Sequence, residues 1–202
     1  SALAFPAAEN GHEVHIVGTC LDDKIIDGYL ATGKHEKFCR PFPENVNYHY
    51  FKDWKTVVEG SDFVIGGVSS FGVDWFLEEI LIQLDPEMPV LSVTKGLRAT
   101  DDGSLLSYPG YWMSELAKRG IHRDICAVGG PCTSYELVFK DPTEVAFCGW
   151  DNEVLRMMKQ AMQRPYYHIS LTNDVIGLES AVALKNAYAM AVTLAVGLNI
   201  RW

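Results

Sequence analysis

Patterns typical of short strands alternate with patterns typical of helices along this chain of 202 residues. Three apolar stretches, at residues 62–68, 89–94 and 124–128, are typical of buried strands, and a helical pattern follows each of them. Strands that alternate with helices predict a parallel sheet with helices on both faces. The fold class that we expect is therefore α/β, with a doubly wound and mostly parallel sheet.

The same patterns give expected bounds for the individual elements. Helices are expected at residues 1–9, 22–32, 54–59, 73–84, 111–118, 133–138 and 152–162. Strands are expected at residues 13–18, 48–51, 62–68, 89–94, 124–128, 143–148 and 166–170. A loop is expected at residues 95–103, and a long last helix begins at Asp174.

The last helix is apolar almost all the way round over residues 176–196, and its chief interruption is the pair Lys185-Asn186. Such a helix is expected to be buried between layers. Burial lowers a lysine pKa by up to about 3–5 units, which suits proton transfer near neutral pH. The alternative is that the long Lys185 side chain reaches solvent. An amine in bulk solvent, far from the crevice above the sheet, would overturn the assignment of an enzyme and leave only the fold. Glu179 is nearly two turns away and is not expected to pair with Lys185.

Three segments follow predicted strands at the carboxyl ends, where ligands bind in open α/β sheets. In the first, Phe71 could stack on a cofactor ring, although an aromatic residue there is usually part of the core. In the second, Lys95 could neutralise a phosphate or polarise a carbonyl, and the alternative is a solvated loop lysine. In the third, residues 129–132 open a helix whose N–H groups could bind an anion. The alternative is a tight turn without a ligand.

Composition narrows the class of partner. The net charge of −9 argues against nucleic acid and against an anionic membrane surface, but not against a small phosphorylated ligand. Five cysteines without a CxxC pair indicate reduced thiols in a cytosolic protein. The histidine spacing predicts no metal site. The most apolar stretch, residues 187–198, is too short for a membrane span.

Five segments, taken in order, resemble the NAD(P)-dependent sn-glycerol-3-phosphate dehydrogenases, within the 6-phosphogluconate dehydrogenase-like superfamily. They are Gly11-His-Glu-Val14, Val68-Ser-Ser70, Val93-Thr-Lys-Gly96, Gly130-Pro131, and Gly177-Leu-Glu-Ser-Ala-Val-Ala-Leu-Lys-Asn186 with Tyr188 after it. The resemblance covers nearly the whole chain. It implies a Rossmann-like sheet, NAD or NADP as cofactor, and hydride transfer between NAD(P)H and dihydroxyacetone phosphate or sn-glycerol 3-phosphate. It also implies a small phosphorylated substrate, a cytoplasmic enzyme of glycerophospholipid metabolism, no nucleic acid and no membrane span. A homodimer is one candidate assembly, and the oligomeric state stays open.

The resemblance also assigns roles to matching positions. Lys185 resembles the catalytic lysine that transfers a proton, and Asn186 resembles its neighbour in the pocket. Lys95 resembles the lysine that touches both cofactor and substrate. Gly130 and Cys132 fall at substrate-contacting positions. Ser134 falls at a cofactor-contacting position, and Phe71 is a further cofactor candidate. Cys132 and Ser134 depart from the usual residues of the family.

The resemblance implies a dinucleotide-binding domain at residues 1–170 and the start of a helical substrate domain at 171–202. The family's first strand and glycine loop have no counterpart here, and neither has the rest of the helical domain. We therefore expect two open strand edges and an inactive fragment. Thr19-Cys20 leaves the choice of coenzyme open. Two alternatives remain: a dehydrogenase of the same superfamily for another hydroxy acid, and a non-catalytic nucleotide-binding module.

Overall fold

The computed structural model describes residues 1–198, and residues 199–202, the end of the range expected for a second domain, lie outside the described residues. The chain forms two compact units, each built from segments that are distant in sequence. The first unit holds residues 1–64, 130–147 and 151–171. The second unit holds residues 65–129, 148–150 and 172 onward.

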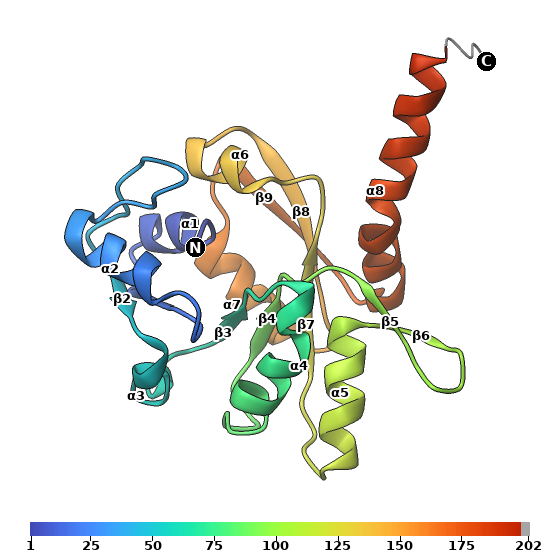
Figure 1. Cartoon of the computed structure of the whole chain (residues 1–202), viewed down its shortest axis with the longest axis horizontal. Helices are drawn as coiled ribbons and strands as arrows, with labels where there is room; N and C mark the ends of the chain where they lie inside the picture. The colour runs from blue at the N-terminus through green and yellow to red at the C-terminus, as the bar shows by residue number, and fades with distance from the viewer. Residues whose placement is uncertain (199–202) are drawn as a thin grey trace. The chain divides into compact units, whose positions relative to one another are not determined.

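The first unit contains a parallel pair of strands, β1 (Val14–Val17) and β2 (Val46–His49), in which Val14 lies opposite Val46. Helices α1 (Ala4–Glu9) and α2 (Asp23–Thr32) pack on this pair (Figure 1). Aromatic rings fill much of the core, and the rings of Phe5 and Phe42 stack with centroids 4.9 Å apart. The buried core residues are Ala4, Phe5, Ala8, Ile26, Tyr29, Phe38, Phe42, Val46 and Val138.

The rest of the first unit follows the expected alternation. It comprises the 3-10 turn η1 (Phe51–Asp53), α3 (Trp54–Val58), α6 (Ser134–Phe139), β8 (Thr143–Cys148), α7 (Asn152–Met162) and β9 (Tyr167–Thr172). Strands β8 and β9 are neighbours. The Asp151 carboxylate accepts hydrogen bonds from the Glu153 and Val154 amides at 2.7 and 3.2 Å, so α7 begins where a capping acid predicts.

The second unit is built on β3 (Val64–Gly66), β4 (Val90–Ser92) and β7 (Ile125–Gly129), which lie side by side in this order. Strands β4 and β7 are parallel, with Ser92 opposite Ala127. Helix α4 (Val73–Phe76) continues as a π-helical turn, η3 (Leu77–Leu81), and α5 (Tyr108–Lys118) packs beside them. The indole of the fully buried Trp112 donates to the Val73 carbonyl at 2.9 Å and ties α5 to α4.

The α/β class with a mostly parallel sheet is confirmed, and β8 and α7 have the expected bounds. Among the described residues, β1 pairs only with β2, and β3 is the outer strand of its sheet. These are the two open edges that were expected. The loop expected at 95–103 was wrong: β5 (Leu97–Ala99) and β6 (Leu105–Ser107) form an antiparallel hairpin. Its tip is closed by Asp102, whose carboxylate accepts from the Ser104 amide at 3.0 Å.

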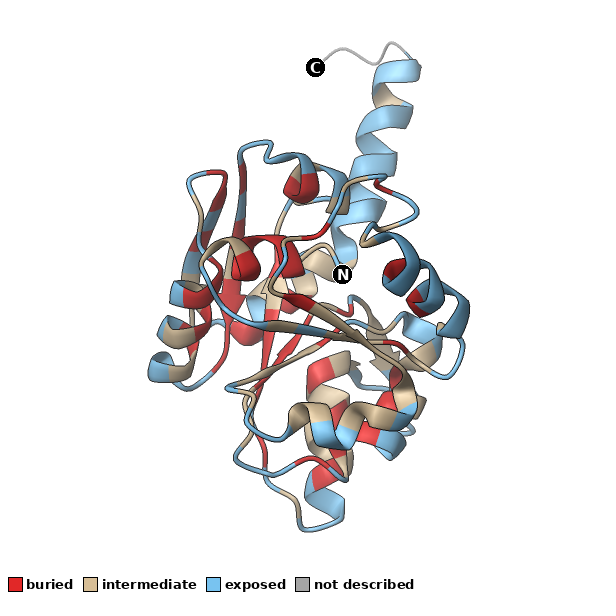
Figure 2. Ribbon diagram, turned by 90° about the vertical axis from the view of Figure 1, so that its left-hand side faces the viewer, coloured by how far each residue is buried: buried red, intermediate tan, exposed pale blue. Residues whose placement is uncertain are grey.

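The last helix, α8 (Val175–Gly197), begins as predicted, because the Asp174 carboxylate accepts from the Gly177 amide at 2.9 Å. Its expected burial was wrong beyond the first turns. Strands β6 and β7 contact α8 near its start, and Figure 2 shows most of the helix as exposed. Exposed apolar residues from the middle of α8 to its C-cap include Leu184, Tyr188, Met190, Val192, Leu194, Val196 and Leu198.

This helix also bears on the membrane prediction. By length and composition alone, the 23 residues of α8 could cross a membrane, and none of its most apolar window is buried. Helices from the cores of water-soluble proteins meet the same criterion, so this is weak support for a span. The argument that residues 187–198 are too short therefore does not hold for the whole helix, and the prediction of no membrane span is not confirmed.

Candidate functional site

The carboxyl ends of β3 and β4 are tied together by the residues that follow them. The hydroxyl of the buried Thr94 donates to the Val68 carbonyl oxygen at 2.8 Å. Thr94 precedes Lys95, and Val68 precedes the 3-10 turn η2 (Ser70–Gly72), which carries Phe71. The structure therefore brings two of the three predicted segments, 69–71 and 95–96, to one edge of the second unit's sheet.

Gly96 fixes the path of the backbone after the exposed Lys95. Its φ is 142°, and a Cβ atom there would lie 2.6 Å from Cε2 of Tyr108. Both the dihedral and the contact require glycine. The predicted turn is confirmed. In this structure the group that approaches Gly96 closely is the ring of Tyr108, the first residue of α5.

Phe71 is 99% exposed, so the interpretation that it belongs to the core was wrong. A ring that is left in water forgoes roughly 1.5–3 kcal/mol of burial free energy. An exposed aromatic ring at a strand end, on the same edge as Lys95, fits a planar cofactor ring that would cover it.

The first turns of α8 dock on the end of β7. Val182 fills the space that a side chain at the buried Gly129 would need, and Leu178 lies 3.1 Å from the same point. Val175 is buried in a small core with Ala127. The close approach of helix and strand therefore depends on glycine at the end of β7.

Lys185 and Asn186 lie three and four residues after Val182, so they share the helix face that packs on Gly129, one turn farther along. Both are exposed, and the expected burial of the Lys185 amine was wrong. The reason is geometric: the contact of α8 with β7 involves Leu178 and Val182, and Lys185 lies past it. The inference of an enzyme from a buried lysine therefore fails, and function has to be argued from other observations.

The buried charge of α8 is Glu179, which is 9% exposed. Desolvation raises the pKa of its carboxyl, and a hydrogen bond with the Ser107 hydroxyl partly opposes that rise. The neighbouring Cys148 is fully buried, and burial raises the pKa of its thiol to about 12. Sequence reasoning missed this cluster because it tested Glu179 only as a partner of Lys185. A second charge in an apolar helix was the available signal.

Residues 130–132 of the third predicted segment belong to the first unit. Gly130 has a φ of 149°, and a Cβ there would lie 2.8 Å from the Glu144 carbonyl oxygen. Cys132 and Ser134 are half-buried. The argument for an anion site at the following helix is weakened, because α6 has only six residues. Its first turn also forms a capping box, in which the side chains of Thr133 and Glu136 each accept a hydrogen bond from the backbone amide of the other residue.

The end of β1 carries an acid that the sequence analysis did not single out. The Thr19 amide and hydroxyl both donate to one oxygen of the half-buried Asp22, at 2.8 and 2.6 Å. A carboxylate beyond the carboxyl end of a strand is the kind of group that meets a ribose hydroxyl in dinucleotide-binding folds.

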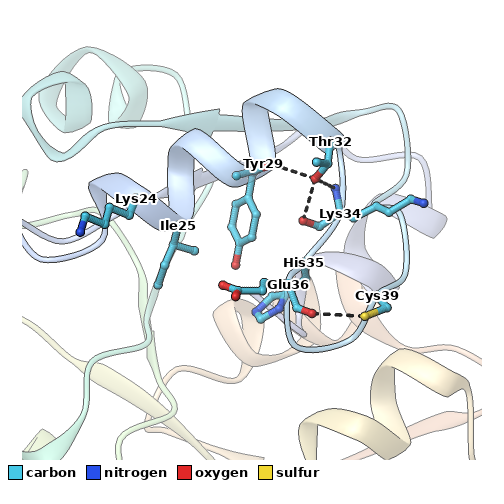
Figure 3. Close-up of a pocket in the computed structure, with 9 residues that line it drawn as sticks. Lys24, Ile25, Tyr29, Thr32, Lys34, His35, Glu36 and Cys39 are labelled. Carbon is cyan, nitrogen blue, oxygen red and sulfur yellow. Dashed lines mark hydrogen bonds between the residues drawn. The ribbon is translucent and has the colours of Figure 1, made fainter.

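The first unit also has a cavity of about 390 Å³ between α2 and the loop after it (Figure 3). Its wall mixes cations, an acid and apolar groups, with Tyr29 pointing toward His35 and Glu36. None of the predicted site residues lines it. Within residues 1–198 no three His, Cys, Asp or Glu side chains are grouped to hold a metal ion.

Comparison with known proteins decides the family. The family described as NAD-dependent glycerol-3-phosphate dehydrogenase N-terminus matches residues 1–155. The chain belongs to this family. The match takes in β1, the Lys95 segment and the Gly130 turn, and the Lys185 helix follows it.

Relatives extend the likeness through α8. The chain is 30% identical over 192 residues to an NADP(+)-dependent glycerol-3-phosphate dehydrogenase of Archaeoglobus fulgidus, covering 95% of this chain and 56% of the relative. It is 29% identical over 205 residues to a chloroplastic NAD(+) enzyme of Oryza sativa, covering 99% of this chain and 44% of the relative. The chain therefore spans about half the length of the curated relatives it matches.

Solved structures agree on the fold. A glycerol-3-phosphate dehydrogenase from Plasmodium falciparum superposes with a TM-score of 0.83 at 21% identity, over 100% of this chain and 57% of that one. The enzyme from Coxiella burnetii gives a TM-score of 0.81 at 20% identity, over 99% and 58%. These structures confirm the Rossmann-like architecture, and the match over residues 1–155 confirms the predicted family.

Proposed function

We propose that this chain is the coenzyme-binding part of an NAD(P)-dependent glycerol-3-phosphate dehydrogenase. The reaction would move a hydride between NAD(P)H and the C2 atom that is a carbonyl in dihydroxyacetone phosphate and an alcohol in sn-glycerol 3-phosphate. The family match over residues 1–155 carries this proposal. The exposed Phe71 and Lys95 at one sheet edge support it, because an apolar ring and a positive charge there suit the ring and the phosphates of a coenzyme.

The coenzyme, when bound, supplies the hydride chemistry. Phe71, Lys95 and Ser134 are the residues proposed to hold it. The acid at Asp22 would meet the adenosine ribose. Relatives named for NAD(+) and for NADP(+) both match, so either coenzyme is included in the proposal.

Lys185 is proposed to give or take the proton of the C2 hydroxyl, with Asn186 beside it. Lys95 would stabilise negative charge that develops on the same oxygen. Gly130 and Cys132 are proposed substrate contacts, carried over from the positions that they match. A primary ammonium on the docked face of α8, beyond Gly129, supports the role of Lys185 without requiring that it be buried in this chain.

Residues 1–170 are proposed to be the dinucleotide-binding domain and α8 the start of a substrate domain. The relatives are nearly twice as long as the match, and further residues of such a protein would cover the apolar second half of α8. We also propose a cytoplasmic location, in keeping with five cysteines that form no disulfide within residues 1–198. A homodimer remains one candidate for the assembly.

The test is steady-state turnover of the natural protein that contains this chain, with dihydroxyacetone phosphate and a panel of other 2-keto compounds. Lys185→Ala should lower kcat by at least about a hundredfold, because general acid–base catalysis contributes roughly 10²–10⁴. Lys118→Ala is the matched control, since Lys118 is an exposed lysine of α5. Coenzyme binding, followed by NADH fluorescence, should be unchanged in both variants.

Normal turnover of Lys185→Ala would remove this residue from the mechanism. A stronger response to another 2-keto compound would replace the substrate. Binding of NADH without turnover of any compound would favour a nucleotide-binding module instead.

A further inference from the structure

Glu179 is a buried charge that the proposed chemistry does not use. It lies in the second turn of α8, is 9% exposed, and faces Ser107, the last residue of β6, a strand that α8 contacts. A carboxylate in an apolar setting is costly unless polar partners compensate. A second charge retained at this depth therefore calls for a reason beyond packing, since an apolar side chain could fill the same volume.

Ser107 occupies a junction in the second unit. It ends β6 and is the N-cap of α5, where its oxygen accepts from the Gly110 amide at 3.3 Å. A hydroxyl oxygen that accepts still carries its own proton, so Ser107 can donate to the carboxyl of Glu179. One serine thus fixes the start of α5 and also contacts α8.

The next residue extends this junction to the loop that carries Lys95. Tyr108 lies against Gly96, so closely that a Cβ at Gly96 would be 2.6 Å from its ring. The dipeptide Ser107-Tyr108 therefore contacts the backbone directly after Lys95 on one side and Glu179 of α8 on the other.

Helix geometry carries the consequence to Lys185. Val182 and Lys185 follow Glu179 at three and six residues, and α8 is a continuous helix through all three. A shift or rotation of the second turn therefore moves Lys185 by a comparable amount. Val182 on Gly129 gives one point of attachment, and Glu179 on Ser107 gives a second. Two attachments on different elements fix the rotation of a helix, which one cannot do.

We propose that Glu179 and Ser107 form a positioning pair that sets the helix bearing Lys185 relative to the segment bearing Lys95. The inference rests on the proposed function, because it assigns the pair to the geometry of those two lysines. Neither residue touches the reacting atoms, and both act through the backbone that they hold.

The test compares three variants of Glu179 and two of Ser107 in the natural protein that contains this chain. Glu179→Gln keeps the volume and an oxygen that can accept from Ser107. Glu179→Met keeps the volume without the hydrogen bond, and Glu179→Ala removes both. Ser107→Ala removes the donor, and Ser107→Thr keeps it. Turnover is expressed per folded molecule, from a melting curve measured for each variant.

Misplacement of a catalytic group by about 1 Å costs up to about a hundredfold in rate. The Met, Ala and Ser107→Ala variants should therefore lose about ten- to a hundredfold in kcat, with the KM for coenzyme within about twofold of the parent. The Gln and Thr variants should retain kcat within about twofold.

Parent-like kcat in Glu179→Met, or equal losses in Glu179→Gln and Glu179→Met, would overturn the positioning pair. A loss that disappears when turnover is corrected for the folded fraction would overturn it as well, leaving a purely structural role. The proposed function fails separately, through normal turnover of Lys185→Ala.

Discussion

The two halves of α8 have similar apolar sequences and opposite surroundings. Val175 and Leu178 in the first half pack on Ala127 and Gly129, and Glu179 is buried with them. Leu194 in the second half is 63% exposed. The difference shows that the burial of a helix depends on the surface that packs against it. An apolar sequence predicts that such a surface exists, but does not provide it.

The comparison also separates two kinds of functional inference. In the first half, contacts with Gly129 and Ser107 define where the helix sits. In the second half, Lys185 and Asn186 have a defined place on the helix face, and their surroundings would come from residues that the longer relatives possess. Changes in the two halves should therefore have very different effects on the stability of this chain.

The largest effect is expected where the first half of α8 packs on the sheet. Gly129→Ala should lower the free energy of unfolding by about 3 kcal/mol, because Val182 already occupies the space of the new methyl group. Gly197→Ala is the control, since nothing lies within 4 Å of a Cβ there. It should change stability by less than about 1 kcal/mol, in the stabilising direction. Urea unfolding measures both, and equal effects would contradict the docking of α8 on β7.

A matched pair of leucines gives a smaller but sharper contrast. Leu178→Ala should cost about 2 kcal/mol, because Leu178 packs on the buried cluster around Ala127 and Cys148. Leu194→Ala should cost less than about 0.5 kcal/mol in this chain, since exposed positions contribute little. Denaturant midpoints at constant slope would report the difference. A loss at Leu194 as large as that at Leu178 would show that the second half is covered.

The cap at the start of α8 should give a smaller change. Asp174→Ala removes the acceptor of the Gly177 amide and should cost about 1 kcal/mol. Asp174→Asn keeps an acceptor of similar capping strength, so its free energy of unfolding should differ from that of the parent by only a few tenths of a kcal/mol. If Ala and Asn variants melt at the same temperature, the first turn of α8 is held by its contacts with the sheet alone.

The pH dependence of stability should depend weakly on Glu179. Its pKa is raised in the folded chain, so the folded state binds the proton more tightly than the unfolded state. Glu179 therefore contributes stability that is complete below the ordinary carboxyl pKa and is lost as pH rises through the folded value. The groups near it are Ser107 and Cys148.

Glu179→Gln removes this titration. The stability of the Gln variant relative to the parent should therefore rise between about pH 4 and pH 7. Chemical denaturation at both ends of that range measures the change. A constant difference across the range would show that Glu179 is not desolvated.

Much of this architecture could be predicted from the sequence because its signals are local. Apolar runs marked β4 and β7, and capping acids marked the starts of α7 and α8. The hairpin β5–β6 was missed because its strands have only three residues each, too few to show an alternating pattern. Only part of the candidate site could be predicted from the sequence. The positions of Lys95 and Lys185 followed from motifs, while the Glu179–Ser107 contact joins residues far apart in sequence and only the fold reveals it.

The prediction that Lys185 is buried was wrong because burial depends on contacts with residues that are distant in sequence. Its helix is apolar enough to be a core helix, yet burial also needs a partner surface, and no property of the helix itself supplies one. A glycerol-3-phosphate dehydrogenase would supply that surface from the part of the protein that the relatives have beyond this match.

Competitive acetylation of lysines in the natural protein, read by mass spectrometry, tests the central claim most directly. Lys185 should react at a rate comparable with Lys118 in the chain described here, because both are exposed. In the natural protein with coenzyme and sn-glycerol 3-phosphate bound, Lys185 should be protected while Lys118 keeps its rate. Undiminished labelling of Lys185 in that complex would contradict its place at the reacting oxygen.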